Sequence, residues 1–287
     1  MEKELSIIIV SWNVAQDLRA CLLSIQKFVH IDYEVIVVDN ASDDDTVHMI
    51  RHDFPMVKLI VNKSNVGFAA ANNQALTKAT GKYILWLNPD TEFRDDHSVV
   101  GALNFLKNQP QIGILGINVR NSDGSQQICV RRYPTLGSQL LTLLKLNTVL
   151  PVLNSRYLAL DFDYSRSQTV DSIIGACMFM PRQTALSLQG FDEHFFIWFE
   201  EVDLCKRVQK FGQHVYYYAD STVIHHGGQS FSQWLTKDKQ KQFNRSLLYY
   251  FSQHCPRWQL WLLYFILPIN FILTTLQSIL KIKKSAY

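Results

Sequence analysis

The stretch that decides the fold is YILWLNPDT, residues 83–91. Its first part, residues 83–87, is a continuous apolar run, which is typical of a strand buried on both faces of a sheet. Asn88, Pro89 and Asp90 end that strand, because proline cannot donate to a sheet ladder and Asn and Asp favour turns. Asp90 is therefore expected just past the carboxyl end of an interior strand, where open α/β sheets bind ligands.

Apolar runs and helical patterns alternate on both sides of this stretch. Strands are predicted at 5–10, 33–38, 57–61, 112–115, 173–180, 215–218 and 221–224, and helices at 46–52, 68–79, 95–107, 181–190 and 200–211, with a further helix starting at Asp17. A hairpin turn is expected at 121–125. This alternation predicts an α/β fold whose mainly parallel sheet is flanked by helices.

Composition narrows the functional classes. A net charge of only +3 over 287 residues gives no reason to expect a nucleic acid as partner. The 5 cysteines form no C-x-x-C pair, so neither a zinc site nor a redox motif is indicated and a reducing, cytosolic setting is expected. Neither a G-x-G-x-x-G nor a G-x-x-x-x-G-K-[ST] motif is present, which argues against a dinucleotide fold and excludes a P-loop protein.

Polar side chains at the strand ends suggest nucleotide and metal chemistry. Asp39 and Asn40 follow the second strand and could bond a base or ribose, while Asn65 and Gly67 precede a helix whose N-terminus favours phosphate. A carboxylate such as Asp90 suits Mg²⁺ or Mn²⁺, which share their oxygen shell with substrate phosphates. Ordinary turn chemistry is the alternative for each site taken singly.

A histidine at a later strand end could join this metal shell. His225 precedes Gly227 and Gly228 and could supply an imidazole nitrogen, although a solvated or core histidine is an equal alternative.

The second informative stretch is residues 190–212, GFDEHFFIWFEEVDLCKRVQKFG. Glu201 shares helical spacing with Leu204 and Cys205, which predicts that it points inward, where desolvation would raise its pKa toward that of a general base. Asp203 is spaced to pair with Arg207 on a solvated face. Acidic residues at a helix start are also favourable for the helix alone, and this is the alternative.

Together these segments resemble the family-2 glycosyltransferases of the GT-A fold, especially the bacterial rhamnosyltransferase-like branch. The resemblance covers about residues 5–230 and is carried by stretches in the family's order: IIIVSWN (7–13), VVDNASDDDT (37–46), NVGFAAANN (65–73), YILWLNPDT (83–91), GACMFMPR (175–182), residues 190–212 and VIHHGG (223–228). The resemblance implies an inverting transfer of a sugar from a nucleotide-diphosphate sugar to an acceptor hydroxyl, assisted by Mg²⁺ or Mn²⁺.

The resemblance and the polar residues at the strand ends together predict the active-site residues. The expected catalytic residues are Glu201 and Glu200, the metal ligands are Asp90 and His225, and the nucleotide-sugar contacts are Ser11, Asn13, Asp39, Asn40, Asn65, Gly67, Asn73, Asn88 and Trp198. Two departures from the family pattern matter. Asp90 is the single carboxylate of its metal motif, and Glu201 stands where the family has Asp as catalytic base.

The chain end is strongly apolar and then basic. Residues 258–280 are long enough to cross a bilayer core, yet Pro268, Asn270 and Gln277 favour an embedded or interfacial tail. The lysines at 281, 283 and 284 suit anionic lipid. We therefore expect a catalytic domain at 1–245 and a membrane-associating tail at 246–287, on the cytoplasmic face of the membrane. A helix pair packed on the domain, or a dimer contact, is the alternative.

The expected partners are a nucleotide-diphosphate sugar donor, a glycan or lipid-linked saccharide acceptor, and the membrane surface. A catalytically idle nucleotide-sugar-binding scaffold of a glycan-assembly complex is the competing hypothesis. A nucleotidyltransferase would need a Gly-rich, Arg- or Lys-bearing loop after the first strand, which Ser11, Trp12 and Asn13 do not provide.

Overall fold

The computed structural model describes residues 2–146, 151–227 and 236–285. The main sheet contains β1 (Leu5–Ser11), β2 (Tyr33–Asp39), β3 (Lys58–Val61), β4 (Tyr83–Leu87), β5 (Thr91–Glu92), β6 (Ile112–Arg120), β8 (Gln168–Thr169), β10 (Cys177–Pro181) and β11 (His214–His225). Among the described residues its strand order is β3-β2-β1-β4-β10-β6-β11-β5, with β8 paired to β11. A separate antiparallel pair joins β7 (Val130–Arg131) to β9 (Ser172–Ile173).

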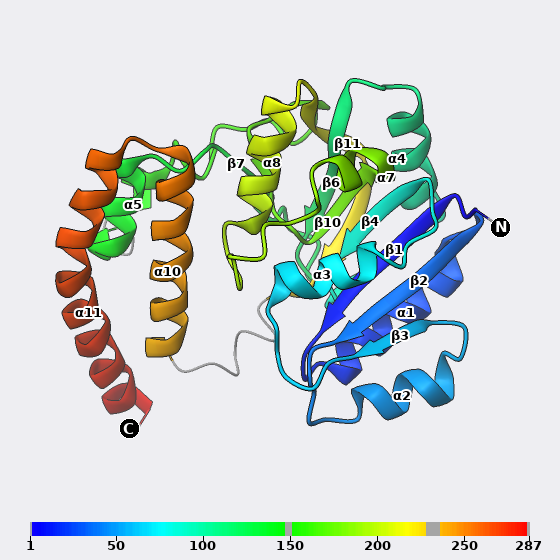
Figure 1. The fold of residues 1–287 in the computed structure, drawn as a ribbon, viewed down its shortest axis with the longest axis horizontal. Helices are drawn as coiled ribbons and strands as arrows, with labels where there is room; N and C mark the ends of the chain where they lie inside the picture. Colours follow the sequence, from blue (N-terminus) through cyan, green and yellow to red (C-terminus); the bar gives the residue numbers. More distant parts are fainter. Residues whose placement is uncertain (1, 147–150, 228–235, 286–287) are drawn as a thin grey trace.

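Helices flank this sheet and form a group at one end of it (Figure 1). They are α1 (Ala15–Phe28), α2 (Thr46–Asp53), α3 (Phe68–Leu76), α4 (His97–Lys107), α5 (Leu136–Leu143), α7 (Arg182–Ser187), α8 (Glu200–Lys210), α10 (Thr236–His254), α11 (Arg257–Ser285) and the 3-10 helix η1 (Pro151–Asn154). The prediction of a mainly parallel sheet with flanking helices is confirmed.

The centre of the sheet is built from the apolar runs seen in the sequence. β1 pairs in parallel with β2 on one side and β4 on the other. Ile8, Ile36 and Trp86 have no exposed surface, and full burial of one isoleucine side chain contributes about 1.5–3 kcal/mol. This packing fixes the carboxyl ends of β1, β2 and β4 side by side, which is what brings distant polar residues together.

Two sequence predictions about strands are corrected by the structure. Residues 173–180 do not form one strand: β9 ends at Ile173, and β10 begins at Cys177 after a turn through Gly175. The chain changes sheets here, since Ile174 N–H bonds the Cys129 carbonyl while the Ala176 carbonyl accepts from Asn88 N–H. The predicted strands 215–218 and 221–224 are instead one strand, β11, with an irregularity between Tyr218 and Thr222.

A second apolar core joins the chain end to the part of the chain that contains the sheet. Its buried members are Leu143, Phe195, Phe199, Val202, Leu247, Tyr250, Phe251 and Leu263. They come from α5, α8, α10, α11 and the loop before α8, so α10 and α11 form a helix pair packed on the domain (Figure 1). The expected boundary between residues 245 and 246 falls inside α10.

The outer face of α11 stays apolar and exposed. Pro268 lies inside the helix without ending it. Arg257–Ser278 is, within the described chain, the one stretch long and apolar enough to cross a membrane by length and composition.

Candidate active site

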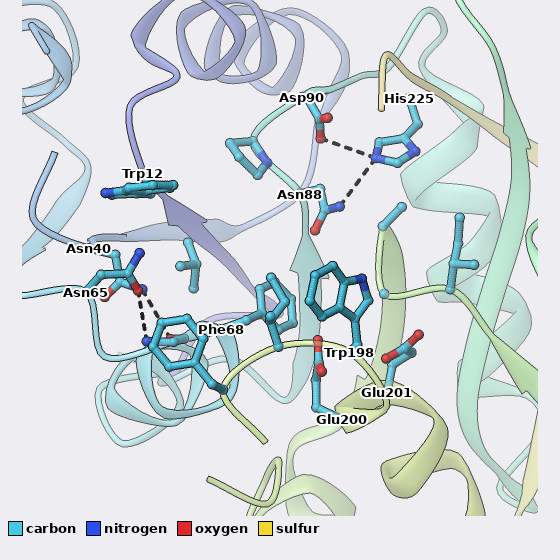
Figure 2. Close-up of a pocket in the computed structure, with 18 of the residues that line it drawn as sticks. Trp12, Asn40, Asn65, Phe68, Asn88, Asp90, Trp198, Glu200, Glu201 and His225 are labelled. Atoms are coloured by element: carbon cyan, nitrogen blue, oxygen red, sulfur yellow. Dashed lines mark hydrogen bonds and ion pairs between the residues drawn. The ribbon is translucent and has the colours of Figure 1, made fainter. Parts of the chain in front are cut away.

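A pocket of about 480 Å³ opens at the carboxyl ends of β1, β2 and β4. Figure 2 shows two groups of side chains within it, with Trp12, Asn40 and Asn65 at one end and Asp90 and His225 at the other. Glu200 and Glu201 approach from the start of α8. The predicted residues Asn40, Asn65, Gly67, Asn88, Asp90, Trp198, Glu200, Glu201 and His225 all line this one pocket.

Asn88, Asp90 and His225 meet although more than 130 positions separate the histidine from the asparagine. β11 runs antiparallel to β5, and His225 pairs with Thr91 in that register. This pairing brings His225 Nε2 to 3.2 Å from Asp90 Oδ1 and 3.3 Å from Asn88 Nδ2. Both Asp90 and His225 are largely buried, so the pair is held in a protected part of the pocket.

Gln127 fixes the tautomer of His225. The Gln127 amide nitrogen donates to Asn121 Oδ1 at 2.8 Å and to the His225 carbonyl at 3.3 Å. Its oxygen must therefore be the acceptor of the 2.7 Å bond to His225 Nδ1, which then carries the proton. In the tautomer that keeps its proton on Nδ1, Nε2 carries the lone pair, and the Asn88 amide nitrogen lies 3.3 Å from it.

A lone pair 3.2 Å from a carboxylate oxygen is repulsive unless a cation or a proton lies between them. Asp90 and His225 thus fit a divalent cation by their chemistry and by the orientation that Gln127 imposes. No cluster of three or more His, Cys, Asp or Glu side chains suited to a metal occurs among the described residues. A cation here would complete its shell with donor oxygens, as Mg²⁺ and Mn²⁺ do with phosphates.

The start of α8 carries the two carboxylates on a strained turn. Trp198 and Phe199 both have positive φ, 68° and 71°, which is costly for bulky residues. α10 holds this turn, because Ser246 Oγ donates to the Ile197 carbonyl at 2.7 Å and Phe199 packs on Tyr250.

The loop before this turn is held on its other side by Gly67. A Cβ at Gly67 would lie 2.6 Å from the Phe196 carbonyl oxygen, and Phe68 N–H bonds that oxygen at 2.7 Å. Only glycine permits this approach and the φ of 90° found there.

Burial raises the pKa of both Glu200 and Glu201, but their neighbours act on the two carboxyls differently. Desolvation raises the pKa of Glu200 well above its ordinary value, and the adjacent charge of Glu201 raises it further. Desolvation also raises the pKa of Glu201, but the Arg131 guanidinium opposes that rise. The arrangement therefore favours a protonated Glu200 beside an ionised Glu201 whose pKa lies above the usual carboxyl range, the state that suits a general base.

The predicted faces of α8 need correction. Glu201 does share a face with Leu204 and Cys205, which are fully buried. Glu200 and Asp203, however, are also buried, at 6% and 2% exposure. The Asp203–Arg207 pair forms at 2.6 Å as predicted, but it is not solvated.

The cause is that α8 packs on two sides. His254 of α10 donates its ring hydrogen bond to Asp203 at 2.6 Å, and Arg207 bonds the carbonyls of Leu188 and Gly190. A helix covered by the sheet on one side and by α10 on the other has no single inward face.

At the other end of the pocket, amide side chains hold the loop before α3. Asn40 Nδ2 donates to the Gly67 carbonyl at 3.1 Å, and its Oδ1 accepts from Asn62 at 3.0 Å. Asn65 Oδ1 accepts from Gly67 N–H. These bonds stiffen a wall whose exposed surfaces are Trp12, Asn65 and Phe68.

The remaining predicted residues lie outside the pocket lining. Ser11 and Asp39 are buried at paired positions of β1 and β2, and Ser11 Oγ and Asp39 Oδ1 have no hydrogen-bond partner among the described residues. Asn13 accepts from Asp43 N–H at 2.7 Å and organises the turn after β2. Asn73 bonds both the N–H and the carbonyl of Phe191 and so holds that loop.

Sequence reasoning missed Trp12, Phe68, Gln127 and Arg131, which all line the pocket. The signal for Trp12 was present in the sequence. Successive side chains of a strand alternate, so Val10 and Trp12 share the pocket side while Ser11 points to the core. No local pattern marks Gln127 or Arg131.

Comparison with known proteins identifies the chain. The model of the family described as glycosyl transferase family 2 matches residues 6–176, more than half of the chain. The chain belongs to glycosyl transferase family 2. As a member it is a glycosyltransferase that uses a nucleotide sugar.

Curated relatives extend beyond the matched segment. The chain is 25% identical over 243 residues to an N-acetylglucosaminyl-diphospho-decaprenol L-rhamnosyltransferase of Mycobacterium tuberculosis, covering 80% of this chain and 78% of that one. It is 26% identical to the low-salt glycan biosynthesis hexosyltransferase Agl10 of Haloferax volcanii, covering 73% of this chain and 63% of that one. The rhamnosyltransferase-like character expected from the sequence is confirmed at family level.

Solved structures share the fold. A mannosyltransferase from Pyrobaculum calidifontis, in complex with GDP-Man and Mn²⁺, matches with a TM-score of 0.60 at 16% identity, over 100% of this chain and 80% of that one. GalNAc-T7 with UDP, GalNAc and Mn²⁺ matches at 0.59 and 17% identity, over 78% of this chain, which spans 44% of that one. The fold is GT-A, as predicted.

Proposed function

We propose that this glycosyltransferase moves a hexose, L-rhamnose, from a nucleoside-diphosphate donor to a hydroxyl of a lipid-linked saccharide during assembly of a cell-surface glycan. The observation that carries the proposal is the pocket itself. It places the Asp90–His225 pair and the Glu200–Glu201 pair in one pocket, with the Trp198 ring between them in the view of Figure 2. The name of the Mycobacterium relative supports the choice of sugar and acceptor.

Glu201 acts as the general base. Its carboxylate takes the proton of the acceptor hydroxyl, whose oxygen attacks the anomeric carbon on the face opposite the diphosphate. The bond from that carbon to the diphosphate breaks, so the product has inverted configuration. Glu200, protonated by burial, stays neutral beside it and donates a hydrogen bond instead of competing for the proton.

Asp90 and His225 would hold a divalent cation, Mg²⁺ or Mn²⁺. When bound there it would neutralise charge on the leaving diphosphate. Asn88, whose amide nitrogen lies 3.3 Å from His225 Nε2, would release that nitrogen to the cation and bond the diphosphate. Trp12 and Phe68 would pack on the nucleoside, and Asn65 would bond it.

The outer face of α11 supports docking at a membrane interface. Its exposed apolar side chains include Trp258, Trp261, Tyr264, Phe265, Phe271 and Ile272. Its inner face is used for packing, since Asn270 bonds Asn244 of α10 at 2.9 Å and the Leu143 carbonyl of α5 at 2.7 Å. Exposed Arg245 therefore lies level with the middle of the apolar stretch and would enter the hydrocarbon if α11 crossed the bilayer. We propose that α11 lies in the interface on the cytoplasmic side.

An enzymatic assay separates this proposal from the idle scaffold. Full-length protein with Mn²⁺, dTDP-L-rhamnose and N-acetylglucosaminyl-diphospho-polyprenol should yield a longer saccharide, and NMR of the product should show inversion at the anomeric carbon. UDP- and GDP-hexoses should react poorly. Donor binding with no transfer or donor hydrolysis across the whole panel would favour the scaffold.

A further inference from the structure

A second cavity, of about 770 Å³, lies outside the catalytic pocket and none of the predicted site residues line it. It is a groove between α5, η1 and the segment that follows β7. One part of its lining is apolar, with Leu140, Leu141, Leu144 and Leu153. Another part is polar and carries the guanidinium groups of Arg132 and Arg156.

The groove and the catalytic pocket share a wall. Arg131 lines the catalytic pocket and its chain neighbour Arg132 lines the groove. Because consecutive Cα atoms are about 3.8 Å apart, the two cavities are immediate neighbours. Burial raises the pKa of Tyr157 in the groove, and the charges of Arg131 and Glu201 also act on this pKa, so the wall reaches the proposed base.

The polar part of the groove contains one guanidinium and one buried oxygen that make no hydrogen bond within the described residues. Arg132 bonds Asp161 at 2.7 Å and the Arg156 carbonyl at 3.0 Å. The Arg156 guanidinium makes no hydrogen bond within the described residues, and after the stronger effect of Arg132 its charge also lowers the pKa of Asp161. Asn154 is only 3% exposed, and its Oδ1 has no hydrogen-bond partner among them either.

The lining also holds one carboxylate, Asp171. Asp171 accepts from Tyr133 N–H at 3.2 Å. The groove therefore presents an available cation, a buried acceptor oxygen and an apolar trough.

We propose that this groove binds the polyprenyl-diphosphate part of the acceptor, with the diphosphate at Arg156 and Arg132 and the first prenyl units along the leucines. The inference rests on the proposed function, because it names where the lipid-linked acceptor docks. Asn154 Oδ1 accepts a hydroxyl or amide proton of the first sugar. The saccharide then passes the Arg131 edge into the catalytic pocket.

Direct binding tests the groove without any turnover. Farnesyl diphosphate is titrated calorimetrically into the full-length protein, in EDTA and with excess nucleoside diphosphate to fill the donor site. It should bind more tightly than either farnesol or inorganic diphosphate. Arg156→Glu and Leu153→Asp should each weaken it by roughly tenfold or more.

Two variants serve as matched controls. Arg166 is an exposed arginine outside the groove, and Leu160 is 53% exposed where Leu153 is 52%. Arg166→Glu and Leu160→Asp should bind as the unchanged protein does. Arg156→Lys should retain most of the affinity, because it keeps the charge.

The outcomes distinguish this inference from the proposed function. Suppose that the protein transfers sugar to the lipid-linked acceptor, but Arg156→Glu and Leu153→Asp bind farnesyl diphosphate as the unchanged protein does. This result would refute the groove as the lipid site and would leave the proposed glycosyltransferase activity supported. No farnesyl diphosphate binding by the unchanged protein also overturns it. Equal binding of dispersed phosphatidylglycerol, lost in the same variants, would show a general anionic-lipid site instead.

Discussion

His225 Nε2 lies 3.2 Å from Asp90 Oδ1, and the bond from Nδ1 to Gln127 turns that nitrogen toward the carboxylate. A carboxylate oxygen and an imidazole nitrogen that face each other at this distance suit a divalent cation between them. The sequence predicts one carboxylate for the metal, and the imidazole lies where a second ligand would stand.

The metal prediction follows from this pair. Asp90→Ala should abolish transfer and remove the Mn²⁺-dependent part of donor affinity. Gln127→Leu should lower the affinity for Mn²⁺ by about 10–100-fold, the usual cost of losing a group that orients a metal-binding histidine. Donor affinity measured calorimetrically with and without Mn²⁺ is the test. Glu92→Gln, which removes a partner of His226, is the control. If Mn²⁺ raises donor affinity as much in Asp90→Ala as in the unchanged protein, Asp90 does not bind the metal.

The membrane prediction concerns the outer face of α11. Trp261 and Phe265 are 73% and 77% exposed, so Trp261→Ser with Phe265→Ser should reduce co-sedimentation with anionic vesicles. Met56→Ser, whose side chain is 74% exposed between α2 and β3, should not reduce co-sedimentation. Alkaline carbonate should release the protein from membranes, since an interfacial helix is not anchored across them. Monodisperse protein that ignores anionic vesicles would show that α11 is a packing surface only.

A stability prediction follows from the buried Glu200 carboxyl. Its raised pKa means that the folded state binds the proton more tightly than the unfolded state, so stability is lost as pH rises from about 4.5 through the folded value. Glu200→Gln should therefore raise Tm at pH 8 by about 2–4 °C or more. The gain should narrow as pH falls toward 4.5. Glu193→Gln, at an exposed position, is the control. An equal rise in Tm in this variant would show that the effect does not come from the raised pKa of Glu200.

The pH prediction concerns Arg131. Its cation lowers the pKa of Glu201, so Arg131→Gln should move the acid limb of kcat to higher pH. The profile should be recorded with saturating donor and acceptor, and Arg166→Gln should leave it in place. If the acid limb of kcat in Arg131→Gln is unchanged or moves to lower pH, Arg131 does not lower the pKa of Glu201.

The sequence predicted the residues that stand directly after apolar strands. Asp90 and His225 were found in this way, because a strand end is a local signal and strand ends share one edge of the sheet. Trp12 was missed although the same strand alternation marks it. Gln127 and Arg131 could not be predicted, since they reach the pocket from a segment without a regular period.

The burial of Asp203 shows a second limit. Helical spacing within α8 predicts one inward face, but His254 lies 51 positions away and covers the opposite side. Contacts of that range are set by the packing of α10 rather than by any pattern within α8. The same packing buries Glu200, so its neutral state follows from the fold and not from helix periodicity.

The most direct test of the account is the turnover of Glu201→Gln. Glutamine keeps the size of the side chain and removes the base, so kcat should fall by about 10²–10⁴-fold with little change in donor affinity. Glu201→Asp should retain part of the activity, and Glu200→Gln should retain more than Glu201→Gln because Glu200 is already neutral. Normal turnover in Glu201→Gln, with loss of activity in Glu200→Gln or Asp203→Asn, would contradict the assignment of Glu201 as the base.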